Sequence, residues 1–411
     1  WKNIEKIPDA ELWRIHNRRR ERLVFFARKR LKKQLQRSGA SHIEIHKADQ
    51  ILDPQILTIC FARRFSTYKR GNLIFSDLNR LLKLINNEKY PMQIILAGKA
   101  HPLDNPGKEI IKEIYHYTKN ERFQNRVIFL EDYDINVAKY LVQGADVWLN
   151  NPRRPLEASG TSGMKAALNG VLNLSILDGW WCEGYADETG FKIGNGEEYD
   201  NNEVQDHLEA EMLYNTIEKE VVPLFYDTDK NNIPTDWIKK MKAAISMAGK
   251  DFSSHRMLID YTQKFYIPGI EASIKLRENN MELTKSVTEW VEKMSQSWES
   301  IHIKDVQIPE MENTIYVGQT FPIKIFISLG DINPNDVSVE IISGKLDSQE
   351  QIHNYKPTMA VLSEQNESDK ISIFSGEVIC KESGRFGITV RIIPNNENLL
   401  HTFKPKLIQW W

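Results

Sequence analysis

The chain has 411 residues, 41% of them hydrophobic and 27% charged, which is typical of a soluble globular protein with two or three domains. The formal net charge of −2 gives no overall attraction to nucleic acid, and no apolar run reaches the ~20 residues of a membrane span. Three scattered cysteines without a C-x-x-C pair argue against a disulfide framework and a zinc site. We therefore expect a cytoplasmic protein without a metal. The first residue is Trp1 and no signal peptide follows, so we also expect part of a longer polypeptide.

Residues 1–50 are predicted to be a helical segment that connects to the main domain. Asp9 follows a proline and is expected to cap a helix that runs to about Arg37. The helix is strongly basic, with three successive arginines at 18–20. Such charge can bind nucleic acid, or it can form a solvated face that pairs with acidic groups. Because aromatic residues are not interleaved with the charges, we favour the second interpretation and expect no nucleic acid.

Residues 51–300 are predicted to be one α/β domain with a doubly wound parallel sheet. Short apolar runs alternate with helical periods, which indicates βαβ units. The predicted strands are Ile56–Phe61, Gln93–Ala97, Arg126–Leu130, Ala145–Leu149 and Val171–Leu177, and the helices between them are Leu73–Ile85, Lys108–Tyr117 and Asn136–Gly144. After Gly194 further helices are predicted at Glu203–Val222, Trp237–Met247 and Ile267–Trp298.

Residues 301–411 differ in character and are predicted to be an all-β sandwich module. Short alternating strands are separated by proline, glycine and asparagine. The predicted strands are Ile303–Ile308, Phe321–Ser328, Val337–Ile342, Ile371–Val378 and Arg385–Ile393, with a loop at Ser363–Lys370. Nothing in this module resembles a catalytic motif.

The loop after the fourth strand of the parallel sheet is the strongest candidate site. The run from Glu157 to Lys165 (EASGTSGMK) joins that strand to a helix expected to start at Met164. Small residues before a helix let backbone N–H groups converge on an anion, above all on a phosphate. Lys165 then has two plausible roles: it can pair with a phosphate, or it can form a Schiff base with a carbonyl cofactor.

The other loops at the carboxyl edge of the sheet carry many cations, which suggests two phosphate groups, one from a cofactor and one from a substrate. These cations are Arg63, Arg64, Lys69, Arg70, Lys99, Arg153, Arg154 and Lys165. Trp180 and Trp181 are either core residues or a stacking platform for a sugar. His101 is expected to bond the backbone before Pro102 rather than act as a base.

Three stretches together resemble the α-glucan (glycogen/maltodextrin) phosphorylases: EASGTSGMK at 157–165, FARRFSTYKR at 61–70 and AGKAHP at 97–102. The NPRRPL run at 151–156 and the DGWW run at 178–181 are similar to the shorter bacterial and archaeal branch. The resemblance covers residues 1–300 and extends more loosely to the β module. It implies a GT-B glycosyltransferase fold, of which this chain would be the Rossmann-like C-terminal domain, with an N-terminal domain expected as its partner. A homodimer is a further expectation.

The resemblance also implies roles for single residues. Lys165 would hold pyridoxal 5′-phosphate, Tyr133 would lie against its ring, and its phosphate would be bound by Arg63 and by the amides of Thr161, Ser162 and Gly163. Arg64 and Lys69 would bind the substrate phosphate, and Glu157, Ser159 and Gly160 would bond glucose hydroxyls. The implied reaction is a retaining one, in which inorganic phosphate releases glucose 1-phosphate from the end of an α-1,4-glucan and the cofactor phosphate exchanges the proton.

Two alternatives remain open from the sequence. One is a GT-B enzyme that uses a nucleotide sugar, although Lys165 would have no use there. The other is an inactive half that binds pyridoxal phosphate or glucan but lacks its N-terminal domain.

Overall fold

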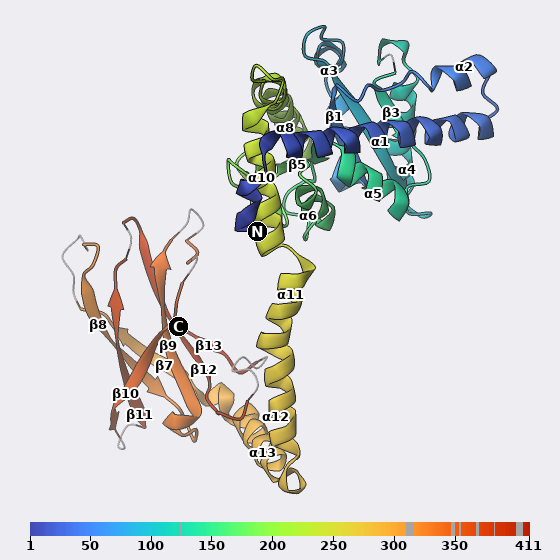
Figure 1. Cartoon of the computed structure of the whole chain (residues 1–411). Helices are drawn as coiled ribbons and strands as arrows, with labels where there is room; N and C mark the ends of the chain where they lie inside the picture. The colour runs from blue at the N-terminus through green and yellow to red at the C-terminus, as the bar shows by residue number, and fades with distance from the viewer. Residues whose placement is uncertain are drawn as a thin grey trace. The chain divides into compact units, whose positions relative to one another are not determined.

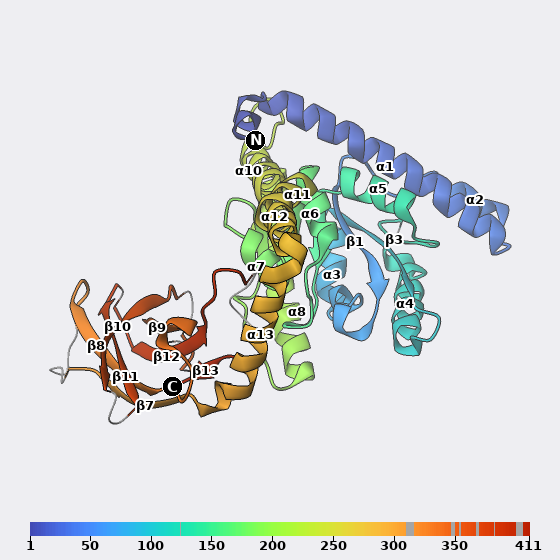
Figure 2. The ribbon, with the colours of Figure 1, turned by 90° about the horizontal axis from the view of Figure 1, so that it is seen from below.

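The computed structural model describes residues 1–123, 125–309, 316–346, 350–352, 355–366, 370–381, 383–399 and 406–411. The chain divides into two compact units, residues 1–258 and 259–411, each with its own apolar core (Figures 1 and 2). None of the described helices has the length and apolar character needed to cross a membrane.

Unit 1 is built on a six-stranded parallel sheet with the strand order β3-β2-β1-β4-β5-β6. The strands are β1 (Leu57–Phe65), β2 (Met92–Ala100), β3 (Val127–Leu130), β4 (Val147–Asn150), β5 (Leu172–Ile176) and β6 (Gly190–Ile193). The predicted parallel α/β sheet is thus confirmed. Chain order reverses between β1 and β4, and at such a switch point loops diverge and leave room for a ligand.

In unit 1, strands β1 and β2 are longer than predicted, and strand β6 was not predicted. β1 and β2 stay paired four and three residues beyond their predicted ends, up to the pair Phe65 and Ala100. Pairing continues because Gly98 has no side chain: a Cβ there would lie 2.1 Å from the carbonyl oxygen of Arg63. Arg63 and Arg64 therefore belong to the end of β1 rather than to a loop. β6 is only four residues long and gave no apolar run of its own.

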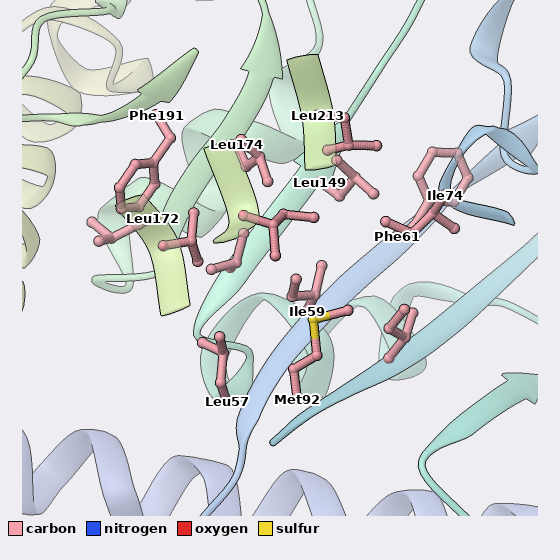
Figure 3. Close-up of a cluster of buried hydrophobic side chains, with 14 of the residues drawn as sticks. Leu57, Ile59, Phe61, Ile74, Met92, Leu149, Leu172, Leu174, Phe191 and Leu213 are labelled. Atoms are coloured by element: carbon pink, nitrogen blue, oxygen red, sulfur yellow. The ribbon is translucent and has the colours of Figure 1, made fainter. Parts of the chain in front are cut away.

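Helices of unit 1 cover both faces of the sheet. The α-helices up to the boundary of the units are α1 (Asp9–Arg37), α2 (His42–Lys47), α3 (Leu78–Ile85), α4 (Asn105–Thr118), α5 (Ile135–Gly144), α6 (Thr161–Leu168), α7 (Trp181–Gly184), α8 (Asn202–Thr216), α9 (Val222–Tyr226), α10 (Thr235–Asp251) and, at that boundary, α11 (Ser254–Tyr261). One face carries the side chains of Figure 3, where Leu57, Ile59 and Phe61 meet Leu149 and Leu174.

The other face of the sheet is covered by α1 and α5, which lie side by side in Figures 1 and 2. α1 ends at Arg37 as predicted, but its N-cap is Pro8, and Asp9 instead forms an ion pair with Lys242 at 2.6 Å. Several of its basic residues bond to the chain itself; the Arg28 guanidinium donates to the carbonyl oxygens of Ile51 and Leu52. These bonds favour a structural use of the basic charge.

Helix limits differ from the prediction where a cap or a kink intervenes. Asp77 caps α3, so residues 73–75 form a separate 3-10 turn. The predicted helix 267–298 is wrong as one helix: it is α12 (Ile267–Arg277) and α13 (Glu282–Ser297), interrupted at residues 279–281 by three left-handed backbone conformations. The predicted helix 203–222 is likewise α8, a π-turn and α9.

Unit 2 carries an antiparallel sheet of the order β13-β12-β9-β10-β11-β8-β7. Its strands are β7 (His302–Gln307), β8 (Thr320–Ser328), β9 (Val337–Lys345), β10 (Thr358–Asn366), β11 (Ile371–Ile379), β12 (Phe386–Pro394) and β13 (Gln409–Trp410). β10 pairs first with β9 and then with β11, so both halves of the sheet share one core. The loop predicted at Ser363–Lys370 is wrong for residues 363–366, which belong to β10, and residues 367–369 lie outside the described part.

Candidate active site

The candidate site lies at the carboxyl ends of β1 and β4, at the switch point of the sheet. β1 ends in Arg63, Arg64 and Phe65 and continues into a short 3-10 turn that contains Lys69. β4 ends at Asn150 and continues into the loop that carries Glu157. Because both strands run in the same direction, the topology brings these two loops together.

A buried ion triad forms the centre of the site. The Glu157 carboxylate accepts hydrogen bonds from Lys69 Nζ at 2.8 and 3.1 Å and from Arg63 Nη2 at 3.0 Å. Lys69 is 7% exposed and Glu157 is 8% exposed, so water screens these charges little. One carboxylate thus neutralises two cations only in part, and the triad keeps a formal charge of +1.

The loop after β5 fixes the backbone of Glu157. Its N–H donates to Asp178 Oδ2 at 2.8 Å, and burial raises the pKa of the Asp178 carboxyl. Gly179 follows with a φ of +56°, and a Cβ there would lie 2.4 Å from the carbonyl oxygen of Ser159. The two loops therefore touch along their backbones, and only glycine fits at this contact.

Both Nη atoms of the Arg63 guanidinium donate hydrogen bonds, whereas its Nε has no acceptor among the described residues. Its Nη1 donates to Asn150 Oδ1, and burial lowers the pKa of the guanidinium while Glu157 opposes that shift. Arg63 Nε and Ser66 Oγ are both buried, and neither has a hydrogen-bond partner in the described part of the chain. Buried groups of this kind usually find a partner, so two at one strand end point to a ligand.

The start of α6 offers further donors. The helix begins at Thr161, three residues before the predicted Met164, and its N-cap is Gly160 with a φ of +95°. Across the described residues, the backbone N–H groups of Thr161 and Ser162 have no acceptor. Gly163 has no room for a side chain, since a Cβ would lie 2.5 Å from Asn173 Oδ1 and 2.8 Å from Trp180 Nε1. The predicted cradle of small residues is therefore the first turn of the helix itself.

Four further predicted residues lie at this edge, and their side chains make no hydrogen bond or ion pair with the described residues of the triad. Arg64 and Lys165 are exposed, and neither side chain bonds to any described residue. Tyr133 follows β3 and is partly buried; burial raises the pKa of its hydroxyl, and the nearby Arg63 charge opposes the shift. Ser159 is exposed, beside the N-cap glycine. The structure thus unites Arg63, Lys69 and Glu157 by direct contact and leaves Arg64 and Lys165 free.

Three of the predicted crevice cations are structural. Arg70 is 2% exposed, donates to the carbonyl oxygens of Asn151 and Pro152, and pairs with Asp206 and Glu209 of α8. Arg153 also pairs with Asp206, and Arg154 donates to the carbonyl oxygen of Leu177 and pairs with Glu198. From the sequence these arginines are counted among the cations of the crevice, and their partners indicate that they hold the loops in place.

The open question about the two tryptophans is answered by their burial. Trp180 is 3% exposed and Trp181 is fully buried, and they pack on each other with their ring centroids 4.9 Å apart. They are core residues rather than a sugar platform. His101 accepts a hydrogen bond from the backbone N–H of Leu103, as its expected structural role requires. Among the described residues no group of His, Cys, Asp and Glu is arranged to hold a metal ion.

Sequence reasoning did not single out Asn150 or Asn173. Asn150 orients Arg63 and donates to Ser175 Oγ, and Asn173 donates to the carbonyl oxygen of Gly163. The available signal was that Asn150 and Asn173 are polar residues inside otherwise apolar strands, since a buried amide in such a strand needs a specific partner.

Two family models match the chain. The carbohydrate phosphorylase model matches residues 10–222, which include the whole parallel sheet and the ion triad, and the model of the glycogen phosphorylase C-terminal domain matches residues 298–411. The chain belongs to the carbohydrate phosphorylase family. The resemblance seen in the sequence motifs is thereby confirmed.

Curated relatives agree with this assignment. The chain is 36% identical over 415 residues to the maltodextrin phosphorylase of Thermococcus litoralis, an alignment with 100% of this chain and 47% of the relative. It is 48% identical over 267 residues to the glycogen phosphorylase of Aquifex aeolicus (65% of this chain, 38% of the relative) and 34% identical to that of Mycobacterium bovis (97% and 46%). The chain spans about half the length of the relatives that it matches from end to end.

Proposed function

We propose that the chain is the catalytic C-terminal half of an α-glucan phosphorylase. Inorganic phosphate would attack the terminal α-1,4-linked glucosyl unit of a glucan such as glycogen or maltodextrin and release glucose 1-phosphate with retention. The observation that carries the proposal is the partly neutralised triad of Arg63, Lys69 and Glu157 beside the free donors of α6, in a chain of this family. Such a site favours bound phosphate over a hydrolytic carboxylate pair.

The residues fit pyridoxal 5′-phosphate as the cofactor. Its phosphate group could be bound by the N–H groups of Thr161 and Ser162 and by the unused Nε of Arg63. Gly163, without room for a side chain, lets the first turn of α6 pack closely against Asn173 and Trp180. Lys165 is exposed and unpaired on the same helix, which suits a covalent attachment of the cofactor, and Tyr133 would lie against its ring. When bound, the cofactor supplies a phosphate group that can give and accept a proton.

The remaining side chains would bind the reactants. Arg64, exposed and unpaired, would bind the incoming phosphate together with Lys69. Glu157 would accept hydrogen bonds from glucose hydroxyls, assisted by the small residues Ser159 and Gly160. In the reaction the bond between C1 and the glycosidic oxygen breaks, a bond from C1 to phosphate oxygen forms, and the proton of the attacking phosphate reaches the departing glucan oxygen. The cations stabilise the anionic charge throughout.

We further propose that unit 1 is one Rossmann-like domain of a GT-B fold, which needs a second domain to complete the sugar site. The strand order, with its switch point between β1 and β4, supports this proposal. The relatives carry about as much chain again as the part aligned here, which is enough for such a domain.

The experiment is glucan phosphorolysis by the complete protein. We expect formation of glucose 1-phosphate from maltodextrin to require both inorganic phosphate and pyridoxal phosphate, and to be lost in Lys165→Ala. Transfer of glucose from a nucleotide sugar without any need for phosphate would instead support the nucleotide-sugar glycosyltransferase. Cofactor binding without turnover by the complete protein would support an inactive binding module.

A further inference from the structure

The Glu157 side chain is engaged only by the cations of the triad. Its two oxygens accept three hydrogen bonds, two from Lys69 and one from Arg63, and it makes no other side-chain hydrogen bond in the described part of the chain. The side-chain exposures are 7% for Glu157, 9% for Lys69 and 10% for Arg63. A carboxylate in such surroundings interacts strongly with both cations, because little water screens the charges.

The backbone and the side chain of Glu157 are held independently. The backbone N–H is fixed by Asp178 Oδ2, which contacts neither Lys69 nor Arg63. Rotation about the side-chain bonds could therefore withdraw the carboxylate from the cations while the loop stays in place. The anchor and the charge are two separate features of the same residue.

The triad leaves donors that a carboxylate cannot satisfy. Arg63 Nε and Ser66 Oγ are buried and unpaired among the residues described, and a buried polar group without a partner destabilises the empty site. The Glu157 oxygens already serve three hydrogen bonds. Phosphate carries more acceptor oxygens and up to twice the charge, so the cofactor phosphate and the incoming phosphate can satisfy these donors and the two cations between them.

We propose that Glu157 is an internal competitor for the phosphate site. The incoming phosphate takes Lys69, and the cofactor phosphate takes Arg63, only when the Glu157 carboxylate gives up these cations. The released carboxylate then becomes an acceptor for sugar hydroxyls, so phosphate binding prepares the sugar contact. This inference rests on the proposed function, because it takes the bound anion to be a phosphate.

The test is a calorimetric titration of the full chain with inorganic phosphate, without added cofactor. Three proteins are compared: the wild type, Glu157→Gln and the control Asp178→Asn. The control removes a negative charge next to Glu157 and one of the two acceptors of the backbone anchor, but it leaves both cations paired. We expect Glu157→Gln to bind phosphate at least about tenfold more tightly than the wild type, and Asp178→Asn to stay within about threefold, since tenfold in affinity corresponds to about 1.4 kcal/mol.

Two results would overturn the inference alone. In the first, Glu157→Gln binds phosphate no more tightly than the wild type; in the second, Asp178→Asn gains as much affinity as Glu157→Gln, so that only the general loss of charge matters. Failure of all three folded proteins to bind phosphate would instead refute the phosphate site of the proposed function.

A second measurement covers the case that Glu157→Gln folds poorly, because the variant leaves two buried cations unpaired. Thermal unfolding followed by circular dichroism at rising phosphate concentration should raise the midpoint more in Glu157→Gln than in the wild type. A variant that stays unfolded even at high phosphate, or gains no more than the wild type, would contradict the competition.

Discussion

The variant Gly163→Ala tests whether the first turn of α6, with its unpaired backbone N–H groups, forms the proposed phosphate site. The added Cβ would lie 2.5 Å from Asn173 Oδ1 and 2.8 Å from Trp180 Nε1, whereas ordinary contact begins at 3.4 Å, so atoms must move by roughly 0.6–0.9 Å. Neither neighbour can yield easily, because Asn173 is 1% exposed and donates to the carbonyl oxygen of Gly163, and Trp180 packs on Trp181. Overpacking of this kind costs about 1–3 kcal/mol, more than the gain in helix propensity from glycine to alanine.

We expect Gly163→Ala to lower the free energy of unfolding by about 1–3 kcal/mol in urea titrations, and to weaken the binding of pyridoxal phosphate about tenfold or more in absorbance titrations. Gly269→Ala is the matched control: Gly269 lies in a helix with nothing within 4 Å of its added Cβ, so this variant should be unchanged or up to about 1 kcal/mol more stable. If both variants behaved alike, the close packing around Gly163 would not determine the shape of the cradle.

Three further predictions concern charged residues at or near the site. Arg70→Ala should destabilise the protein by about 3–5 kcal/mol in urea titrations, because it leaves Asp206 and the buried Glu209 without their partner; a loss below 1 kcal/mol would contradict a structural role. Arg64→Ala removes an exposed and unpaired cation, so its stability should stay within about 0.5 kcal/mol of the wild type, while phosphate binding measured by calorimetry should weaken markedly; unchanged binding would exclude Arg64 from the phosphate site. Burial raises the pKa of Asp178 above its ordinary value, so its stabilising contribution is present below that ordinary value and is lost as pH rises through the raised pKa. The stability of the wild type relative to Asp178→Asn should therefore fall as pH rises above about 4, the ordinary pKa of an aspartate, and a rise would refute the assigned shift.

Much of unit 1 could be predicted from the sequence because buried parallel strands are nearly continuous apolar runs. The runs around β1 to β5 were found in this way, and so was the position of the candidate site after β4. The ends of the strands were harder to predict, because pairing extends through the charged residues Arg63 and Arg64, where the hydrophobic pattern has already stopped. The missing side chain of Gly98, which permits this pairing, becomes informative only once its neighbour is known.

The partners of the cations could not be predicted from the sequence. Arg63 and Arg70 occur within eight residues of each other and look alike in the motif, yet Arg63 borders the unpaired donors and Arg70 is enclosed by α8. The difference arises from Asp206 and Glu209, which lie more than a hundred residues away in the sequence. The break at residues 279–281 was also missed, although Asn279 and Asn280 are residues that tolerate a left-handed backbone.

The measurement that tests the central claim most directly is borohydride reduction of the full chain in the presence of pyridoxal phosphate, followed by peptide mapping. The proposed site predicts one dominant label, on Lys165, and a strong loss of that label in Gly163→Ala, because the added Cβ would displace the first turn of α6, whose N–H groups would bind the cofactor phosphate. Label scattered over exposed lysines such as Lys99, or no label at all, would contradict a cofactor site in this chain.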